Sequence, residues 1–254
     1  MLLGIIGASR HHTHRAALTG STQGMLAVCA TEIVTFGLVL GLALLISRAS
    51  RDDLFLRWRR PWLTLGLGAW YSIAIRMALG FVGTLVCAAL VLCHVTTLPE
   101  MEAFIKSNKP DLEAAVSLSA LKNNPVYAVL SLTLVSFVVA GLREELWRAA
   151  SLAGLRRLWP RLFGSRVGGC LAAGLIAIVF GFGHLPMGMV AVAGTALIGW
   201  FLGCIMVLHR STWMAVIAHG MFDAATFAAV AYMPKDLLKL EPAALLHCIP
   251  PLTF

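Results

Sequence analysis

Side chains that can take up and release protons occur in this chain within otherwise apolar segments. Glu144 and Glu145 lie in one such segment, His184 ends a second, and His219 and Asp223 lie in a third. A charge near the centre of a bilayer costs about 2.5–3.5 kcal/mol on insertion scales, so groups of this kind are normally paired or functional. Carboxylates and histidines together can supply a base, a hydrogen-bond donor and an acid, which peptide hydrolysis requires. The pattern therefore indicates a proton-handling site inside a membrane.

The composition supports a membrane protein. Of the 254 residues, 59% are hydrophobic and only 13% are charged, and the mean hydropathy is +0.84. Soluble domains are roughly 45–50% apolar and about 25% charged. The composition thus excludes an ordinary soluble domain, a disordered chain, a collagen-like rod and a small secreted module held by disulfides.

Six membrane-spanning helices are predicted, because a bilayer leaves backbone polar groups no partners outside the segment itself. They cover residues 24–47, 64–95, 126–158, 167–185, 187–208 and 213–232. The fold class is therefore all-α, a polytopic transmembrane helical bundle. Residues 98–121 mix apolar and charged side chains at helical spacing, which predicts an amphipathic helix on the outer surface.

The distribution of charge predicts how the chain is oriented. The loop 48–61 holds five Arg against two Asp, whereas the loop 96–125 holds three Lys against four acids. By the positive-inside rule the first loop is cytoplasmic, and the N-terminus is then non-cytoplasmic. The net charge of +8 is accounted for by such loops, so no nucleic-acid partner is predicted. We expect an integral, multi-pass membrane protein.

No metal site, disulfide or cleaved signal peptide is predicted from the N-terminal residues or the cysteines. Residues 1–6 are too short an apolar run for a signal-peptide core, so the first span is predicted to be a retained anchor. His11, His12 and His14 are interpreted as part of a solvated tail. Five of the six cysteines lie in apolar runs without CxxC spacing, which is typical of buried, reduced thiols.

The depth of the polar side chains in the membrane can be counted at 1.5 Å per residue. This places Glu144, His184 and Asp223 about 21, 27 and 20 Å above the inner face, and His219 about 13 Å above it, if 126–158 is one unbroken helix. Tilts and kinks absorb a spread of this size. His219 and Asp223 also project from one helical face. We therefore expect these side chains to meet in one water-accessible cavity.

A second polar set consists of Glu32 and Arg76, on the first two predicted spans. Both lie about 20 Å from the inner face. Equal depth on consecutive antiparallel helices predicts an ion pair between them, which we interpret as a structural strut outside the site.

Three motifs follow one another along the chain. They are Glu144-Glu145 with Trp147-Arg148, Phe180 with His184, and His219 with Asp223. Their order resembles the CPBP family of intramembrane proteases, which includes the Rce1-like type II CAAX prenyl endopeptidases and abortive-infection proteins and has the pattern EExxxR, FxxxH and HxxxN or HxxxD. The resemblance covers Val126 to about Met233. It implies a catalytic helical core at 126–233, between an N-terminal two-span region with an external amphipathic loop (1–125) and a C-terminal tail (234–254).

The first motif departs from the family pattern by one residue. Arg148 follows Glu145 by three positions where the family has four, and Ala149 stands where Gly is common. Matching the glutamates gives Glu144 the catalytic position, with Arg148 four residues later and able to pair with it. Matching Trp-Arg instead places Arg143 there, and a cation cannot act as the base. We favour the first alignment.

The resemblance implies an endopeptidase that uses a glutamate to activate water against a membrane-associated protein or peptide. The predicted catalytic residues are Glu144, Glu145, Arg148, His184, His219 and Asp223. Glu144 is the base, and His184 positions the water. His219 and Asp223 form the oxyanion hole. Glu145 and Arg148 orient Glu144.

No cofactor is favoured, although zinc is an alternative. Glu144, His184, His219 and Asp223 have acceptable donor atoms for that ion. The motifs of other intramembrane proteases, HExxH, GxSG and GxGD, do not occur in the sequence.

Two other classes of function stay open. A non-catalytic scaffold or immunity protein could keep the fold without the chemistry, and a proton-coupled transporter also carries buried acids and histidines. Replacing Glu144 by Gln discriminates them, because a protease then loses cleavage, a scaffold keeps its phenotype and a transporter loses flux. Nothing in the sequence indicates whether a substrate is prenylated.

Overall fold

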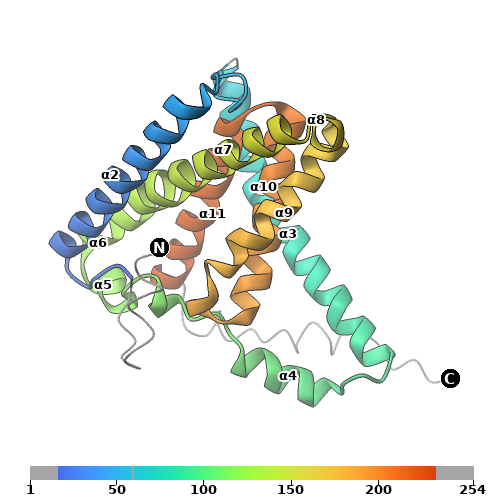
Figure 1. The fold of residues 1–254 in the computed structure, drawn as a ribbon. Helices are drawn as coiled ribbons and strands as arrows, with labels where there is room; N and C mark the ends of the chain where they lie inside the picture. The colour runs from blue at the N-terminus through green and yellow to red at the C-terminus, as the bar shows by residue number, and fades with distance from the viewer. Residues whose placement is uncertain (1–16, 59, 233–254) are drawn as a thin grey trace.

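The structure, a computed structural model, describes residues 17–58 and 60–232. Within these ranges the chain is helical and contains no strand, which confirms the all-α bundle (Figure 1). The helices are α2 (Thr22–Ser47), α3 (Pro61–Leu92), α4 (Leu98–Ser107), η1 (Leu112–Ala114), α5 (Leu118–Asn123), α6 (Pro125–Leu130), η2 (Ser131–Leu142), α7 (Arg143–Leu158), α8 (Pro160–Phe163), α9 (Arg166–Phe182), η3 (Leu185–Met187), α10 (Met189–His209) and α11 (Thr212–Tyr232). The predictions for His11, His12, His14 and the tail 234–254 concern residues outside the described ranges.

Five helices are long and apolar enough to cross a membrane: α2, α3, the continuous helix Pro125–Leu158, α10 and α11. The remaining predicted span, 167–185, corresponds to α9, an apolar helix of 17 residues. At 1.5 Å per residue α9 is about 26 Å long, slightly less than the roughly 30 Å of a hydrocarbon core. The chain is an integral membrane protein. The non-cytoplasmic N-terminus stays a prediction.

The third predicted span is one rod built from α6, η2 and α7. Its middle part, η2, is a π-helix, in which hydrogen bonds span five residues rather than four. The buried hydroxyl of Ser136 follows this spacing and donates to the carbonyl of Ser131 at 2.8 Å. The π-helix ends at Leu142, so the α-helix that carries Glu144 and Glu145 begins directly after it.

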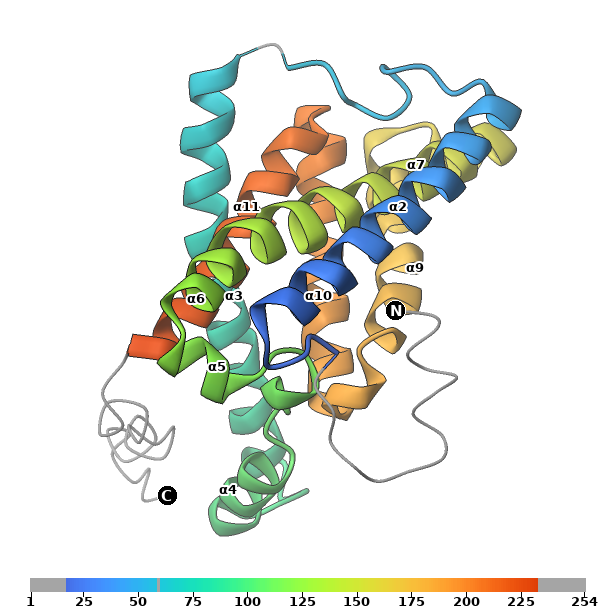
Figure 2. The same cartoon turned by 90° about the vertical axis from the view of Figure 1, so that its left-hand side faces the viewer.

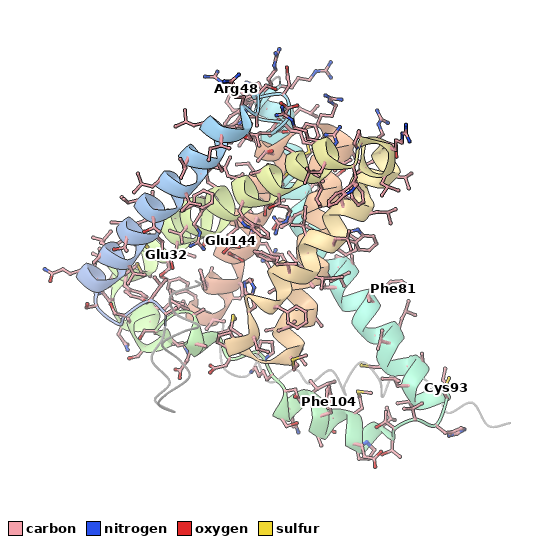
Figure 3. All side chains as sticks on the ribbon, viewed as in Figure 1. Glu32, Arg48, Phe81, Cys93, Phe104 and Glu144 are labelled. Atoms are coloured by element: carbon pink, nitrogen blue, oxygen red, sulfur yellow. The ribbon has the colours of Figure 1, made fainter. Side chains whose placement is uncertain are left out.

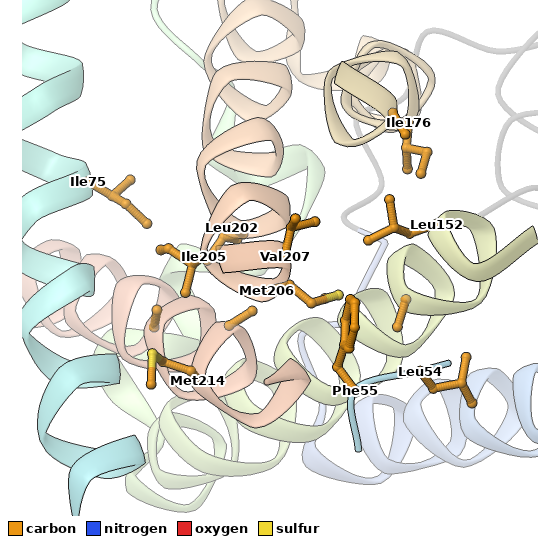
Figure 4. Packing of buried hydrophobic residues seen from close by; sticks show 14 residues of the cluster. Leu54, Phe55, Ile75, Leu152, Ile176, Leu202, Ile205, Met206, Val207 and Met214 are labelled. Atoms are coloured by element: carbon orange, nitrogen blue, oxygen red, sulfur yellow. The ribbon is translucent and has the colours of Figure 1, made fainter. Parts of the chain in front are cut away.

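One apolar core joins α7, α10 and α11. Leu152 of α7, Met206 of α10 and Met214 of α11 pack together with Leu54 and Phe55 from the loop before α3, as Figure 4 shows. Two hydrogen bonds fasten that loop to the start of α11, from the Thr212 hydroxyl to the Leu54 carbonyl (2.6 Å) and from the Trp213 indole to the Leu56 carbonyl (2.7 Å). This core therefore fixes the relative positions of α7, α10 and α11.

Helix α3 packs on α11 only through its first part. Its buried residues are Thr64, Gly68, Ser72 and Ile75, whereas Phe81 is 65% exposed. Beyond this point α3 diverges from the other helices and leads into α4 (Figures 1 and 2). Residues of the second half of α3, among them Val82 and Leu90, line a cavity between this helix and the bundle.

The predicted amphipathic segment 98–121 is not one helix. It forms α4, the short turn η1 and α5, separated by non-helical residues. Helix α4 starts with a capping box, in which the Thr97 hydroxyl accepts from the Glu100 N–H and the Glu100 carboxylate accepts from the Thr97 N–H. The following loop contacts the turn after α9, because the Asp111 N–H donates to the Met187 carbonyl at 3.1 Å.

Candidate active site

A cavity of about 2750 Å³ lies between α2, the second half of α3, α4, η2 and α7, the α9–α10 turn and α11. Most of its lining residues are apolar, and Phe104 of α4 is one of them. Four of the predicted site residues line it: Glu144, His184, His219 and Asp223. Glu145 and Arg148 are not among the lining residues and are fully buried. The six side chains thus divide into a cavity-facing group and a buried pair.

Two of the cavity-facing carboxyl groups lie near one histidine nitrogen. The Nε2 atom of His219 lies 3.9 Å from Oε2 of Glu144 and 3.6 Å from Oδ2 of Asp223. The side chain of Glu144 is 14% exposed, whereas that of Asp223 is 26% exposed. These two carboxyl groups and the imidazole can therefore contact the same small molecule, such as a water, from one wall of the cavity.

The other nitrogen of His219 is bound to the buried pair. Its Nδ1 lies 2.8 Å from Oε1 of Glu145, and because a carboxylate only accepts, Nδ1–H is the donor. The same Glu145 oxygen forms an ion pair with Arg148, three residues later on α7. A histidine whose Nδ1–H is held by a carboxylate has a fixed tautomer and ring orientation. The Arg148–Glu145–His219 chain therefore directs Nε2 toward the cavity.

Phe180 connects the buried arginine to His184. The Arg148 guanidinium lies over the Phe180 ring, 4.7 Å from its centroid, and the His184 ring is 4.8 Å from the same centroid. Nδ1 of His184 lies 3.2 Å from the Phe180 carbonyl. Since a carbonyl only accepts, Nδ1 carries the proton and Nε2 is left as an acceptor. Such an acceptor can position a water molecule.

The expected pairing of Arg148 with Glu144 is wrong. Arg148 pairs with Glu145, and the partner of Glu144 is Arg143, whose Nη2 donates to Oε1 at 3.0 Å. Around the helix axis Arg148 lies about 40° from Glu144 and about 60° from Glu145, so its spacing allows either pairing. Burial decides between them, because Arg148 and Glu145 are both fully buried while Glu144 lines the cavity. Glu145 faces the bundle interior together with Arg148, while Glu144 faces the cavity.

The predicted Glu32–Arg76 strut is also wrong. Arg143 is the arginine that pairs with Glu32. Arg76 instead donates to the Ser72 hydroxyl at 2.9 Å, to the Phe222 carbonyl and to the Thr226 hydroxyl at 3.3 Å. Depth alone could not distinguish the partners, because Glu32 lies at the level of both arginines. Contacts between α2 and α7 decide the pairing.

Small residues let the helices approach closely enough to form this site. A Cβ atom on Gly203 of α10 would lie 2.6 Å from the Cβ of Ala173 and 3.5 Å from Cδ of Arg148. One on Gly199 would lie 3.3 Å from Nη2 of Arg148. Gly141 has the same role where η2 crosses α11, because its Cβ would lie 3.1 Å from the Val216 carbonyl. These glycines create the space for the buried guanidinium and for the contact between η2 and α11.

Replacing Gly203 by Ala is expected to destabilise the protein by about 1–3 kcal/mol, because the added methyl group overpacks the interface between α9 and α10. Gly154→Ala is the matched control, since a Cβ there meets nothing within 4 Å and helical Ala is favoured over Gly by about 1 kcal/mol. Thermal unfolding in detergent measures both. A Gly203→Ala protein as stable as Gly154→Ala would contradict the close packing.

Zinc stays an alternative to the metal-free reaction. Within the described ranges, no three His, Cys, Asp or Glu side chains are arranged to hold one metal ion. Nε2 of His219 lies 3.9 Å from the Glu144 carboxylate and 3.6 Å from that of Asp223. A histidine whose other ring nitrogen donates to a carboxylate, as Nδ1 of His219 does to Glu145, occurs in metal sites as well as in metal-free ones.

Fold and cavity together define a polytopic helical membrane protein with carboxylates and histidines inside its membrane-spanning bundle. Residues 125–225 match the family described as Type II CAAX prenyl endopeptidase Rce1-like. This match confirms the resemblance to the CPBP family proteases, and it suggests CAAX-type intramembrane protease activity. No curated protein and no solved structure gave a significant match. The matched segment begins at α6 and ends shortly after Asp223, so it contains all six predicted site residues.

Several residues that shape the site lie outside the predicted set. Arg143 appeared only as an alternative match to the catalytic position, although it bridges Glu32 and Glu144. Gly199 and Gly203 were not singled out, yet their GxxxG spacing is a known signal for close helix packing in membranes. The bridge through Arg143 had no comparable signal, because it joins residues more than 100 positions apart.

Proposed function

We propose that the protein is an intramembrane endopeptidase that hydrolyses a peptide bond of a membrane-associated substrate with a water molecule activated by Glu144. The observation that carries the proposal is the placement of Glu144 within 3.9 Å of the Nε2 atom of His219, on a cavity that His184 and Asp223 also line. The match of residues 125–225 to the Rce1-like endopeptidases supports the same reaction.

In the proposed mechanism Glu144 removes a proton from water, and Nε2 of His184 accepts the water's second hydrogen bond and orients it. Attack on the carbonyl carbon forms a tetrahedral intermediate with a negatively charged oxygen. His219 can donate to this oxygen when Nε2 is protonated, and Asp223 can do so when its carboxyl group keeps its proton. Preorganised donors of this kind contribute about 2.7–4 kcal/mol each to transition-state stabilisation.

The proton taken up by Glu144 is then transferred to the leaving amine, so the carboxylate is regenerated and no covalent intermediate forms. Glu145 and Arg148 remain behind the site and hold His219. This assignment supports matching the glutamates rather than Trp-Arg with the family motif, because Arg148 occupies the buried supporting position and Arg143 lies beside the base.

The size and lining of the cavity support a largely apolar substrate. Its volume of about 2750 Å³ exceeds the roughly 300–1,000 Å³ of ordinary small-molecule pockets. Apolar side chains of α3 and α4, among them Val82, Leu90 and Phe104, line the cavity. A peptide segment with an attached lipid or with large apolar side chains has the chemistry to fill this space.

The purified protein, reconstituted in phospholipid vesicles, is expected to cleave a quenched fluorescent peptide that ends in farnesyl-cysteine followed by two aliphatic residues and one further residue. Mass spectrometry identifies the product. Added hydroxylamine is expected to capture no acyl group, because water attacks the carbonyl directly. Capture of a peptide hydroxamate would contradict the direct attack and indicate an acyl-enzyme.

The same assay separates the alternatives. The peptide without the farnesyl group shows whether prenylation is required, and prior dialysis against EDTA shows whether cleavage depends on a metal ion. Activity that survives dialysis supports the metal-free reaction, whereas activity restored only by zinc would overturn it. A folded protein that cleaves neither peptide would favour the non-catalytic scaffold.

A further inference from the structure

One arginine connects the N-terminal helix to the proposed base. Nη1 of Arg143 pairs with Oε2 of Glu32 on α2, and its Nη2 donates to Oε1 of Glu144 at 3.0 Å. The side chains of Glu32, Arg143 and Glu144 are only 27%, 15% and 14% exposed. Figure 3 shows Glu32 and Glu144 close together where α2 passes α7.

This bridge crosses the boundary of the family match. Glu32 lies in α2, outside residues 125–225, whereas Arg143 and Glu144 lie within them. All three residues line the cavity. The motif-bearing segment therefore obtains one of its charged contacts from a helix that carries none of the motifs.

The geometry of the guanidinium explains what the bridge can do. Its planar fork presents separate N–H groups in fixed directions, so two carboxylates bound to the two Nη atoms define the orientation of the whole group. An arginine held at one end only retains several rotatable bonds. Glu32 thus limits the positions that Arg143 can adopt, and Arg143 in turn limits those of Glu144.

The charges in the bridge also matter. Arg143 alone would place a full positive charge beside a base that must accept a proton. Glu32 shares that charge, and interactions between such partly buried groups are screened less by salt than those at a surface. Through both effects, the orientation of Arg143 and the sharing of its charge, Glu32 therefore favours a Glu144 carboxylate that can bind and deprotonate a water molecule.

We propose that Glu32 is a positioning residue that acts through Arg143 to hold Glu144 in its reactive orientation, so that α2 completes the active site. This inference rests on the proposed endopeptidase function. It assigns to the N-terminal helix a part in the chemistry in addition to membrane anchoring. In this role Glu32 acts on Glu144 through Arg143 and takes no part itself in the proton transfer.

A double-mutant cycle tests the inference on the farnesylated peptide in vesicles. Glu32→Gln is expected to lower kcat by about 10- to 100-fold, because a displacement of the base by about 1 Å can reduce the rate by about that factor. KM is expected to stay within about twofold of the wild-type value. Arg143→Gln is expected to lower kcat at least as much. Because Glu32 acts through Arg143, the double variant should be no slower than Arg143→Gln alone.

Glu102→Gln is the matched control, because it removes the same charge from α4 at a residue that does not line the cavity. It should keep the kcat of the wild-type protein. Glu32→Asp keeps the charge and is expected to recover part of the loss, which a purely steric role of the side chain would not produce. Glu32→Asp also serves as the test variant if Glu32→Gln does not fold.

Two results would overturn the positioning role. One is a folded Glu32→Gln protein with the kcat of the wild-type protein, and the other is a double variant in which the two single losses multiply. A wild-type protein that cleaves no peptide would remove the proposed function together with this inference. An active wild-type protein with an unaffected Glu32→Gln variant would remove this inference alone.

Discussion

Replacing Glu144 by Gln is expected to lower kcat for peptide cleavage by about 10²- to 10⁴-fold, the usual contribution of a positioned general base. The amide has nearly the same shape as the carboxylate and can still accept a hydrogen bond from Arg143, but it cannot take a proton from water. KM should change little, because Glu144 acts on the water rather than on the substrate. Initial rates on the farnesylated peptide measure both quantities.

The controls for this variant separate chemistry from folding. Glu144→Gln should unfold at nearly the temperature of the wild-type protein, because its side chain borders the cavity and is 14% exposed. Glu102→Gln, which loses the same charge on α4, should remain fully active. Full activity of a folded Glu144→Gln protein would show that another group is the base.

The sequence predicted the helices well because each one has a local cause. Runs of about 20 apolar residues determine membrane spans, and capping residues mark several ends, such as Ser165, whose hydroxyl accepts from the Gly168 N–H before α9. The predicted span at 126–158 appears as one continuous helix, Pro125–Leu158. Its π-helical section was not predicted, because the hydrogen-bond spacing within an apolar helix leaves no distinct mark in the residue pattern.

The sequence also identified which residues could form the site, but not how they pair. The motifs and the depth count brought Glu144, His184, His219 and Asp223 to one region, and the structure places them on one cavity. The partners of the arginines were assigned wrongly, because pairing depends on the rotation of each helix about its axis. A shift of one residue rotates a side chain by about 100°, and a count of depth does not register this angle.

Replacing Arg148 by Met is expected to reduce the stability of the protein by about 3–5 kcal/mol, because it leaves the Glu145 carboxylate buried without its cation. Both side chains are fully buried, and the volume available to Arg148 is set by Gly199 and Gly203. The variant should therefore unfold at a clearly lower temperature in detergent. Arg161→Met, on the exposed face of α8, is the matched control and should unfold like the wild-type protein.

A second variant separates the structural role of this pair from its role in the site. Glu145→Leu combined with Arg148→Met removes both buried charges, and replacement of a buried ion pair by apolar residues is often neutral or stabilising. The double variant should therefore regain most of the stability that Arg148→Met loses. It should nevertheless remain a poor enzyme, because Nδ1 of His219 then lacks the carboxylate that fixes its orientation. Recovery of both stability and kcat in the double variant would show that the pair serves folding alone, whereas recovery of stability without kcat assigns it to the positioning of His219.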